Sequence, residues 1–130
     1  MDVCGPMPET SLGGSRYVAT FLDDYSKLSV AIPVPSKAEV IPTVKTTVNF
    51  LENQSGQKLR AVRTDRGEEY LNKELWYFSA NGIMHETTAP YTPEQNGKAE
   101  RLNRTLMERV RAMLMYWVNH LLHILAPRCP

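Results

Sequence analysis

Cysteine is scarce in this 130-residue chain, which has two cysteines, Cys4 and Cys129, and three histidines. No pair of cysteines stands at the spacing of a zinc finger, so a structural zinc domain is excluded. The sequence also shows no secretory signal peptide. Two cysteines in a chain of this kind predict an intracellular protein in a reducing compartment.

Long hydrophobic runs are also missing. The most apolar stretch, residues 112–126, is interrupted by Asn119, His120 and His123. A helix that crosses a membrane needs about 20 apolar residues. We therefore expect no membrane association, and this stretch predicts a helix end that is buried or faces a partner.

A large excess of charge of one sign is missing as well, since 15 basic residues stand against 14 acidic ones. A protein that bound DNA over its whole surface would usually be strongly basic, so any DNA contact must be local or shared with other domains. Basic residues do gather between positions 98 and 111, where five stand against two acids: Lys98, Arg101, Arg104, Arg109 and Arg111. A solvated helix face, with Arg104 paired to Glu108, explains them equally well.

Periodicity and turn residues predict one α/β domain, and a hydrophobic content of 42% suffices for a modest core. Strands are expected at residues 16–22, 27–34, 58–64 and 83–88, and helices at 36–53 and 71–80. Ser36 and Glu39 have the spacing of a capping box, while Pro42 should kink the first turn or delay the start of its helix. Asp23 and Asp24 predict a reversing turn rather than metal ligands.

The stretch from residue 90 to residue 106 should begin as a loop and continue as a helix. Pro90 and Pro93 lack backbone donors, and Asn96-Gly97 is a strong turn dipeptide. Apolar residues at positions 99, 102, 106, 110, 113 and 117 then form one face at helical period. Glu100 is therefore expected in the first turn of this helix, behind the loop.

Three carboxylates could converge in this arrangement. Asp2 and Asp65 are expected on strands and Glu100 on a helix, and an Asp at the end of a strand points to where α/β sheets usually hold ligands. Carboxylate oxygens are the hard ligands that Mg²⁺ or Mn²⁺ needs. A plain turn at Asp65 and a solvated Glu near a helix N-terminus explain the same residues without a metal.

Four segments, taken in order, resemble the integrase catalytic core of copia-type LTR retrotransposons. They are DVCGPM at 2–7, YVATFLDDYS at 17–26, RTDRGEEY at 63–70 and APYTPEQNGKAERLNRT at 89–105. The resemblance implies an RNase H-like α/β fold, a mixed five-stranded sheet flanked by helices, with a long C-terminal helix. It also implies an acidic triad that binds two metal ions, Mg²⁺ or Mn²⁺. Asp2, Asp65 and Glu100 match the three acids of that triad.

The resemblance further implies a metal-dependent polynucleotidyl transferase that performs DNA strand transfer and 3′-end processing. Double-stranded DNA would be the partner, and a homo-oligomer and a nuclear location follow by analogy. The alternative is an inactive remnant that only binds DNA or self-associates. The implied phosphate contacts are Lys98, Arg101 and Arg104, and the implied contacts to the DNA end are Tyr91, Gln95 and Asn96.

The sequence departs from the family pattern in several places. Only Met1 precedes Asp2, so the first strand is expected to be truncated and Asp2 to be poorly held. Glu68 stands where the family usually has a second glycine, and the spacing from Asp65 to Glu100 is one residue shorter than usual. The resemblance stops at about residue 114, which predicts an integrase core at 1–114 and a divergent tail at 115–130.

Overall fold

The computed structural model describes the backbone of residues 1–64, 71–87 and 93–125. Side chains are described at 1–64, 76–87, 97, 98 and 100–116. The chain divides into two compact units, Met1–Ala99 and Glu100–Pro130. The domain boundary predicted at residue 114 stays a prediction.

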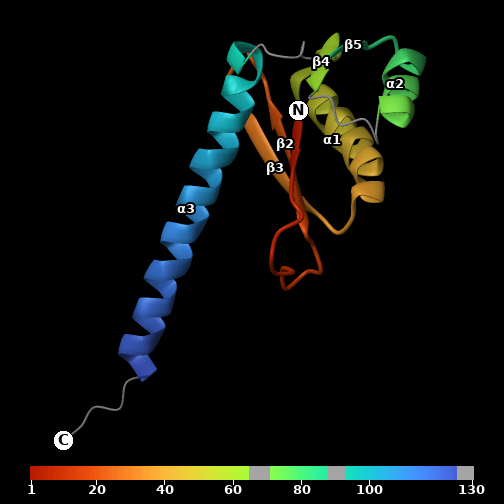
Figure 1. Ribbon diagram of the computed structural model, residues 1–130. Helices are drawn as coiled ribbons and strands as arrows, with labels where there is room; N and C mark the ends of the chain where they lie inside the picture. The colour runs from red at the N-terminus through yellow and green to blue at the C-terminus, as the bar shows by residue number, and fades with distance from the viewer. Residues whose placement is uncertain (65–70, 88–92, 126–130) are drawn as a thin grey trace, which may run out of the picture. The chain divides into compact units, whose positions relative to one another are not determined.

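Three antiparallel strands form the first sheet of the N-terminal unit, in the order β1-β2-β3 (Figure 1). They are β1 (Asp2–Cys4), β2 (Tyr17–Leu22) and β3 (Ser29–Val34). β2 is rich in aromatic and β-branched residues, which fit a pleated sheet. The strands predicted at 16–22 and 27–34 are confirmed, with starts one and two residues later.

The connection between β2 and β3 is a turn organised by Asp23. The Asp23 backbone N–H donates to the Leu28 carbonyl at 2.9 Å, and its carboxylate accepts from the Ser26 N–H at 2.9 Å. Lys27 adopts a left-handed backbone, with φ at 62°. Asp23 therefore stabilises the chain reversal as predicted, because its short side chain bonds the backbone of its own turn.

Two parallel strands form a second sheet, β4 (Ala61–Thr64) beside β5 (Met84–Thr87). Between them in the chain comes α2 (Leu71–Ala80), as predicted. The N-terminal ammonium of Met1 donates to the Arg63 carbonyl at 2.8 Å, so the start of β1 lies beside β4. The described strands nevertheless pair as three and two, and a continuous five-stranded sheet is not confirmed. β1 is only three residues long, which leaves little backbone for a ladder on its second edge.

A short 3₁₀ turn, η1 (Lys37–Glu39), leads into the helix α1 (Val40–Ser55). Neither Ser36 nor Glu39 makes a side-chain cap hydrogen bond, so the predicted capping box is wrong. The reason is that η1 separates Ser36 from the first turn of α1. Pro42 lies in that first turn, where an amide donor would have no partner in any case.

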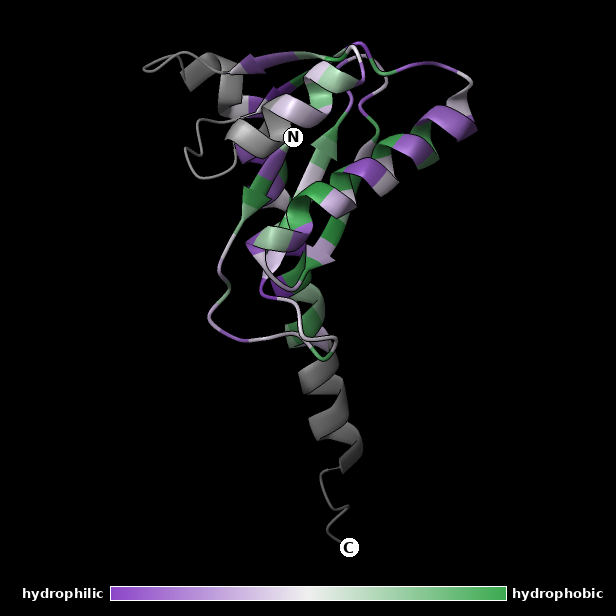
Figure 2. Cartoon of the chain, turned by 90° about the vertical axis from the view of Figure 1, so that its right-hand side faces the viewer, coloured by the Kyte–Doolittle hydropathy of each residue, from purple (hydrophilic) through white to green (hydrophobic). Residues whose placement is uncertain are grey.

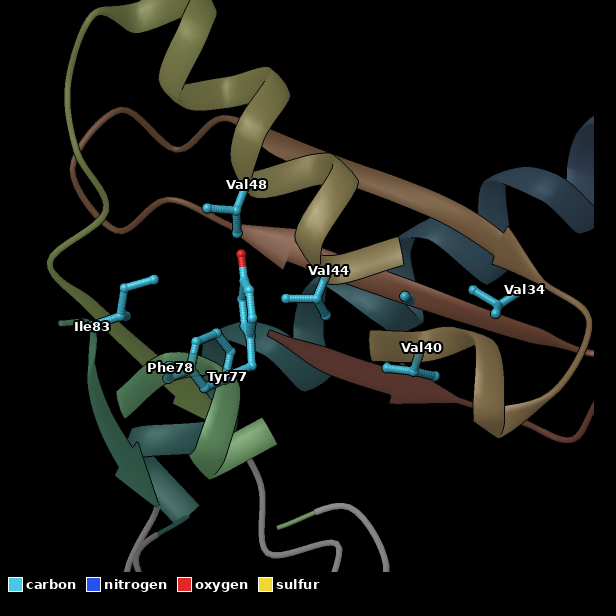
Figure 3. Close-up of a cluster of buried hydrophobic side chains, with 8 residues drawn as sticks. Val34, Val40, Val44, Val48, Tyr77, Phe78 and Ile83 are labelled. Carbon is cyan, nitrogen blue, oxygen red and sulfur yellow. The ribbon is translucent and has the colours of Figure 1, made fainter. Parts of the chain in front are cut away.

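The core of this unit lies between α1, α2 and the strands (Figure 3). Val40, Val44 and Val48 are buried along one face of α1, as their spacing predicts, and Phe78 of α2 is fully buried. Burying such a side chain contributes about 1.5–3 kcal/mol relative to leaving it exposed. Helical positions alternate between hydrophobic and hydrophilic (Figure 2), as expected of helices with one buried face.

The helix α3 (Pro93–Leu125) supplies the described part of the second unit and begins within the first. Because α3 starts at Pro93, the predicted loop through Asn96-Gly97 and the predicted start at Ala99 are wrong. Proline favours the first helical position, since its missing N–H has no helical partner there and its fixed φ suits the helix. None of the described helices combines the length and hydropathy needed to cross a lipid bilayer.

Candidate functional site

The candidate site begins where β1 and β4 meet. The hydrogen bond from the Met1 ammonium to the Arg63 carbonyl joins the two strands at 2.8 Å. Asp2, the first residue of β1, and Thr64, the last residue of β4, directly follow the two bonded residues. Asp65 comes next in the chain but lies outside the described residues, so its position stays a prediction.

The backbone of Asp2 is held by the neighbouring strand β2. Asp2 is in register with Thr20, whose hydroxyl donates to the Asp2 carbonyl at 3.2 Å. Thr20 is buried, and the Asp2 Oδ1 atom accepts from the Val3 N–H at 2.9 Å. β1 therefore keeps its ladder with β2 at the residue that matches the first acid.

A buried polar contact supports the end of β4. The hydroxyl of Thr64 lies 2.7 Å from Nε2 of His85 on β5, and Thr64 is almost fully buried. The His85 ring stacks on Phe78, with centroids 5.4 Å apart and planes 18° apart. Burial lowers the pKa of His85 below its ordinary 6.5, which favours the neutral imidazole. Sequence reasoning missed this contact; its available signal was polar residues near the ends of two predicted strands.

Glu100, the residue that matches the third acid, lies on α3 as the first residue of the second unit. Its side chain is exposed, as are those of Arg101 and Arg104. Among the described residues, no three His, Cys, Asp or Glu side chains gather closely enough to hold a metal ion. Because Asp65 is not among them, the predicted triad and its metal ions stay predictions.

The predicted contacts to the DNA end fall on the start of α3 and before it. Tyr91 lies outside the described residues. Gln95 and Asn96 lie on α3 rather than in the predicted loop. Their DNA-binding roles stay predictions, and any contact by these two residues would come from the first turn of a helix, where the backbone N–H groups have no partner within the helix.

Lys98 is bound by a carboxylate of the β2–β3 turn. Its Nζ lies 2.6 Å from Oδ1 of Asp24, and the same oxygen lies 3.1 Å from Nζ of Lys27. The hydrogen bond from Lys98, followed by that from Lys27, lowers the pKa of Asp24 from 3.8 to about 2. Sequence reasoning missed this pairing, since 74 positions separate Asp24 from Lys98 and no local pattern links them.

Comparison with known proteins identifies the family. A sequence model described as the integrase core domain matches residues 1–93, and a second model with the same description matches residues 81–126. This chain belongs to the integrase core domain family. The resemblance drawn from the four sequence segments is thereby confirmed.

Curated relatives of this integrase core domain are transposon Pol polyproteins. The retrovirus-related Pol polyprotein from the tobacco transposon TNT 1-94 is 44% identical over 114 residues, which are 87% of this chain and 9% of the relative. That from the Arabidopsis thaliana transposon RE1 is 34% identical over 110 residues, 84% of this chain and 7% of the relative.

A third relative is the truncated transposon Ty1-A Gag-Pol polyprotein of Saccharomyces cerevisiae. It is 32% identical over 116 residues, 87% of this chain and 10% of the relative. The integrase core domain described here therefore spans a tenth or less of the length of these three relatives.

Proposed function

We propose that this integrase core domain joins DNA ends to target DNA by strand transfer, with the acidic side chains of Asp2, Asp65 and Glu100 at its centre. The observation that supports the proposal most directly is the hydrogen bond between Met1 and Arg63, which sets β1 beside the strand that leads to Asp65. The family match covers all three acids, because it extends over residues 1–126.

The same bond supports a finer statement about the sheet. We infer an RNase H-like order β3-β2-β1-β4-β5, in which β1 is the central strand between the two observed sheets. In such an order the start of β1 and the end of β4 are neighbours, so Asp2 and Asp65 would face one site. Ligands of α/β sheets commonly bind at the carboxyl ends of strands, such as the end of β4 that leads to Asp65.

Integrase cores generally work with divalent cations, and the acidic residues of this chain suit them chemically. Asp2, Asp65 and Glu100 would hold two Mg²⁺ or Mn²⁺ ions, because carboxylate oxygens are the hard donors that these ions prefer. Such ions supply Lewis-acid activation of the attacking oxygen and stabilise the leaving oxygen of a phosphodiester.

The chain's other residues would bind and orient the DNA. Arg101 and Arg104 would contact backbone phosphates as exposed cations, which fixes register without reading sequence. Tyr91, Gln95 and Asn96 would contact the DNA end. Holding the attacking hydroxyl near the scissile phosphodiester is itself a large part of the rate acceleration expected. Acting on chromosomal DNA, the domain would work in the nucleus.

A second candidate function is self-association or DNA binding without catalysis. The observation that favours it is a run of exposed apolar side chains on α3, which are Met113, Leu114, Met115 and Tyr116, each exposed by 57% or more. Exposed apolar side chains in such number often mark helices that contact other proteins. A homo-oligomer would cover part of them.

The deciding experiment is Mn²⁺-supported disintegration and joining of a branched DNA by the purified chain. Glu100→Gln removes one acid of the triad, and Glu108→Gln is the matched control, since Glu108 is an exposed glutamate on the same helix. We expect the wild type and Glu108→Gln to join DNA, and Glu100→Gln to lose at least about 100-fold in rate. Equal rates for all three would exclude the catalytic proposal, while DNA binding without joining would support the second candidate.

A further inference from the structure

Two lysines from distant parts of the chain share one carboxylate oxygen. Oδ1 of Asp24 lies 2.6 Å from Nζ of Lys98 on α3 and 3.1 Å from Nζ of Lys27 in the β2–β3 turn. Lys27 also donates to the backbone carbonyl of Asp24. Because both ammonium groups contact the same oxygen, their nitrogens are no farther apart than these two distances together. One carboxylate oxygen therefore bridges both ammonium groups.

The bridging carboxylate is open to solvent and can be exchanged. The exposed fractions of the side chains are 76% for Asp24, 61% for Lys98 and 60% for Lys27. Exposed ion pairs are weak and are screened by salt. The neighbouring acid, Asp23, is engaged differently, because its carboxylate accepts from the N–H and the hydroxyl of Ser26. The pair of lysines thus has a single, weakly held carboxylate between them.

We propose that Lys27 and Lys98 form a binding site for one backbone phosphate of DNA, and that Asp24 occupies this site in the free protein as an internal competitor. The inference rests on the proposed function, since DNA is what brings the phosphate. A phosphodiester has two non-bridging oxygens, one for each ammonium group, and lysine binds phosphate as a compact charge. Lys27 thereby joins the DNA-binding residues, although nothing in the local sequence around it indicates that role.

The proposal predicts opposite effects for the carboxylate and for the lysines. Asp24→Asn removes the competing charge, so DNA affinity should rise about two- to five-fold, the range expected for release of an exposed ion pair. Lys98→Met should weaken binding and reduce the slope of log affinity against log salt by about one, as loss of one phosphate contact does. Lys27→Met should act in the same direction as Lys98→Met.

The experiment is a fluorescence-anisotropy titration of a labelled duplex of about 20 base pairs, without divalent cations, between about 50 and 200 mM KCl. The proteins are the wild type, Asp24→Asn, Lys27→Met, Lys98→Met and the double variant Asp24→Asn/Lys98→Met. The matched control is Glu52→Gln, which changes the net charge by the same amount and releases Lys58 from an ion pair of 2.7 Å. A parallel arm adds inorganic phosphate at constant ionic strength.

The proposal is supported if Asp24→Asn binds more tightly than both the wild type and Glu52→Gln, and if the double variant loses this gain. It is overturned if Asp24→Asn only equals Glu52→Gln, if it binds more weakly than the wild type, or if no protein binds the duplex. The proposal would also be overturned if inorganic phosphate, at the same concentration as the duplex, displaced the duplex. That result would show that the site prefers free phosphate to the phosphate groups of DNA.

Two controls test the alternatives. Thermal stability tests whether Asp24 has a structural role, and a titration without metal ions separates phosphate binding from catalysis. Thermal melts should leave Asp24→Asn within a few degrees of the wild type, and a larger fall would overturn the proposal by giving Asp24 a structural role in the turn. The titration contains no divalent cation and measures no joining. A catalytically dead chain can therefore still confirm the phosphate site, and an active integrase core can still lack it.

Discussion

Thr64 and His85 are joined across the parallel β4–β5 pair by a contact of 2.7 Å between the threonine hydroxyl and Nε2 of the imidazole. In the register of these strands Val62 pairs with His85 and Thr64 with Thr87, so the contact is diagonal. The contact therefore holds the side chain of Thr64, the residue directly before Asp65. The His85 ring stacks on the fully buried Phe78, so the protonation state of His85 affects stability.

Acidification should destabilise the N-terminal unit through His85. Burial lowers the pKa of His85 in the folded protein below the 6.5 expected when it is unfolded. The unfolded chain therefore binds the proton more readily, and stability present above pH 6.5 is lost as the pH falls towards the folded pKa. Urea unfolding between about pH 5 and pH 7.5 measures this, and His85→Gln should flatten the dependence. Equal pH slopes for the two proteins would contradict the prediction.

Removing the hydroxyl of Thr64 should cost about 1–3 kcal/mol of unfolding free energy, because Thr64→Val leaves a partly buried imidazole nitrogen without this partner. Valine keeps the β-branched shape, so packing changes little. Thr87→Val is the matched control, since Thr87 is exposed on the neighbouring strand. Denaturant unfolding of both variants checks the difference, and equal losses would show that the contact contributes nothing specific.

Truncating Phe78 should destabilise the core far more than truncating another phenylalanine on the same unit. Phe78 is fully buried, whereas Phe50 is 59% exposed. Phe78→Ala should lower the free energy of unfolding by about 3–5 kcal/mol, and Phe50→Ala by about 0.5 kcal/mol or less. Urea titrations followed by circular dichroism give both values. A similar cost at the two positions would mean that Phe78 does not belong to the core.

Self-association should depend on the exposed apolar side chains of α3. Leu114 and Tyr116 are 60% and 69% exposed, and Leu114→Lys or Tyr116→Lys should lower the fraction of dimer or higher oligomer at a given concentration. Leu12→Lys is the control, because Leu12 is a fully exposed apolar residue in the loop between β1 and β2. Sedimentation velocity measures the distribution. If all three variants behave alike, the α3 surface is not the interface.

Several elements could be predicted from the sequence because their signals are local. The strand at Tyr17–Leu22 follows from β-forming residues, and the buried face of α1 follows from valines four positions apart. Gly56, with φ at 67°, ends α1 as a left-handed cap requires. The family could also be predicted, since four separate segments agree with one pattern and the comparisons confirm it.

Local signals failed where two of them competed. Asn96-Gly97 predicted a turn, but α3 begins at Pro93 and continues through both residues. A helix started by proline adds one hydrogen bond for each further residue, which outweighs the cost of about 1 kcal/mol for a glycine inside it. Ser36 and Glu39 failed as a capping box for a similar reason, because the 3₁₀ turn η1 intervenes before α1.

The sequence by itself determined most of the secondary-structure elements and the family membership, because neighbouring residues carry those signals. Tertiary structure alone decided that Met1 binds Arg63, that Thr64 contacts His85 and that Asp24 holds Lys98. Each of these pairs is separated by at least 21 positions. Such contacts form only when burial and hydrogen bonding over the folded unit bring distant backbone segments together, and no short stretch of sequence contains that information.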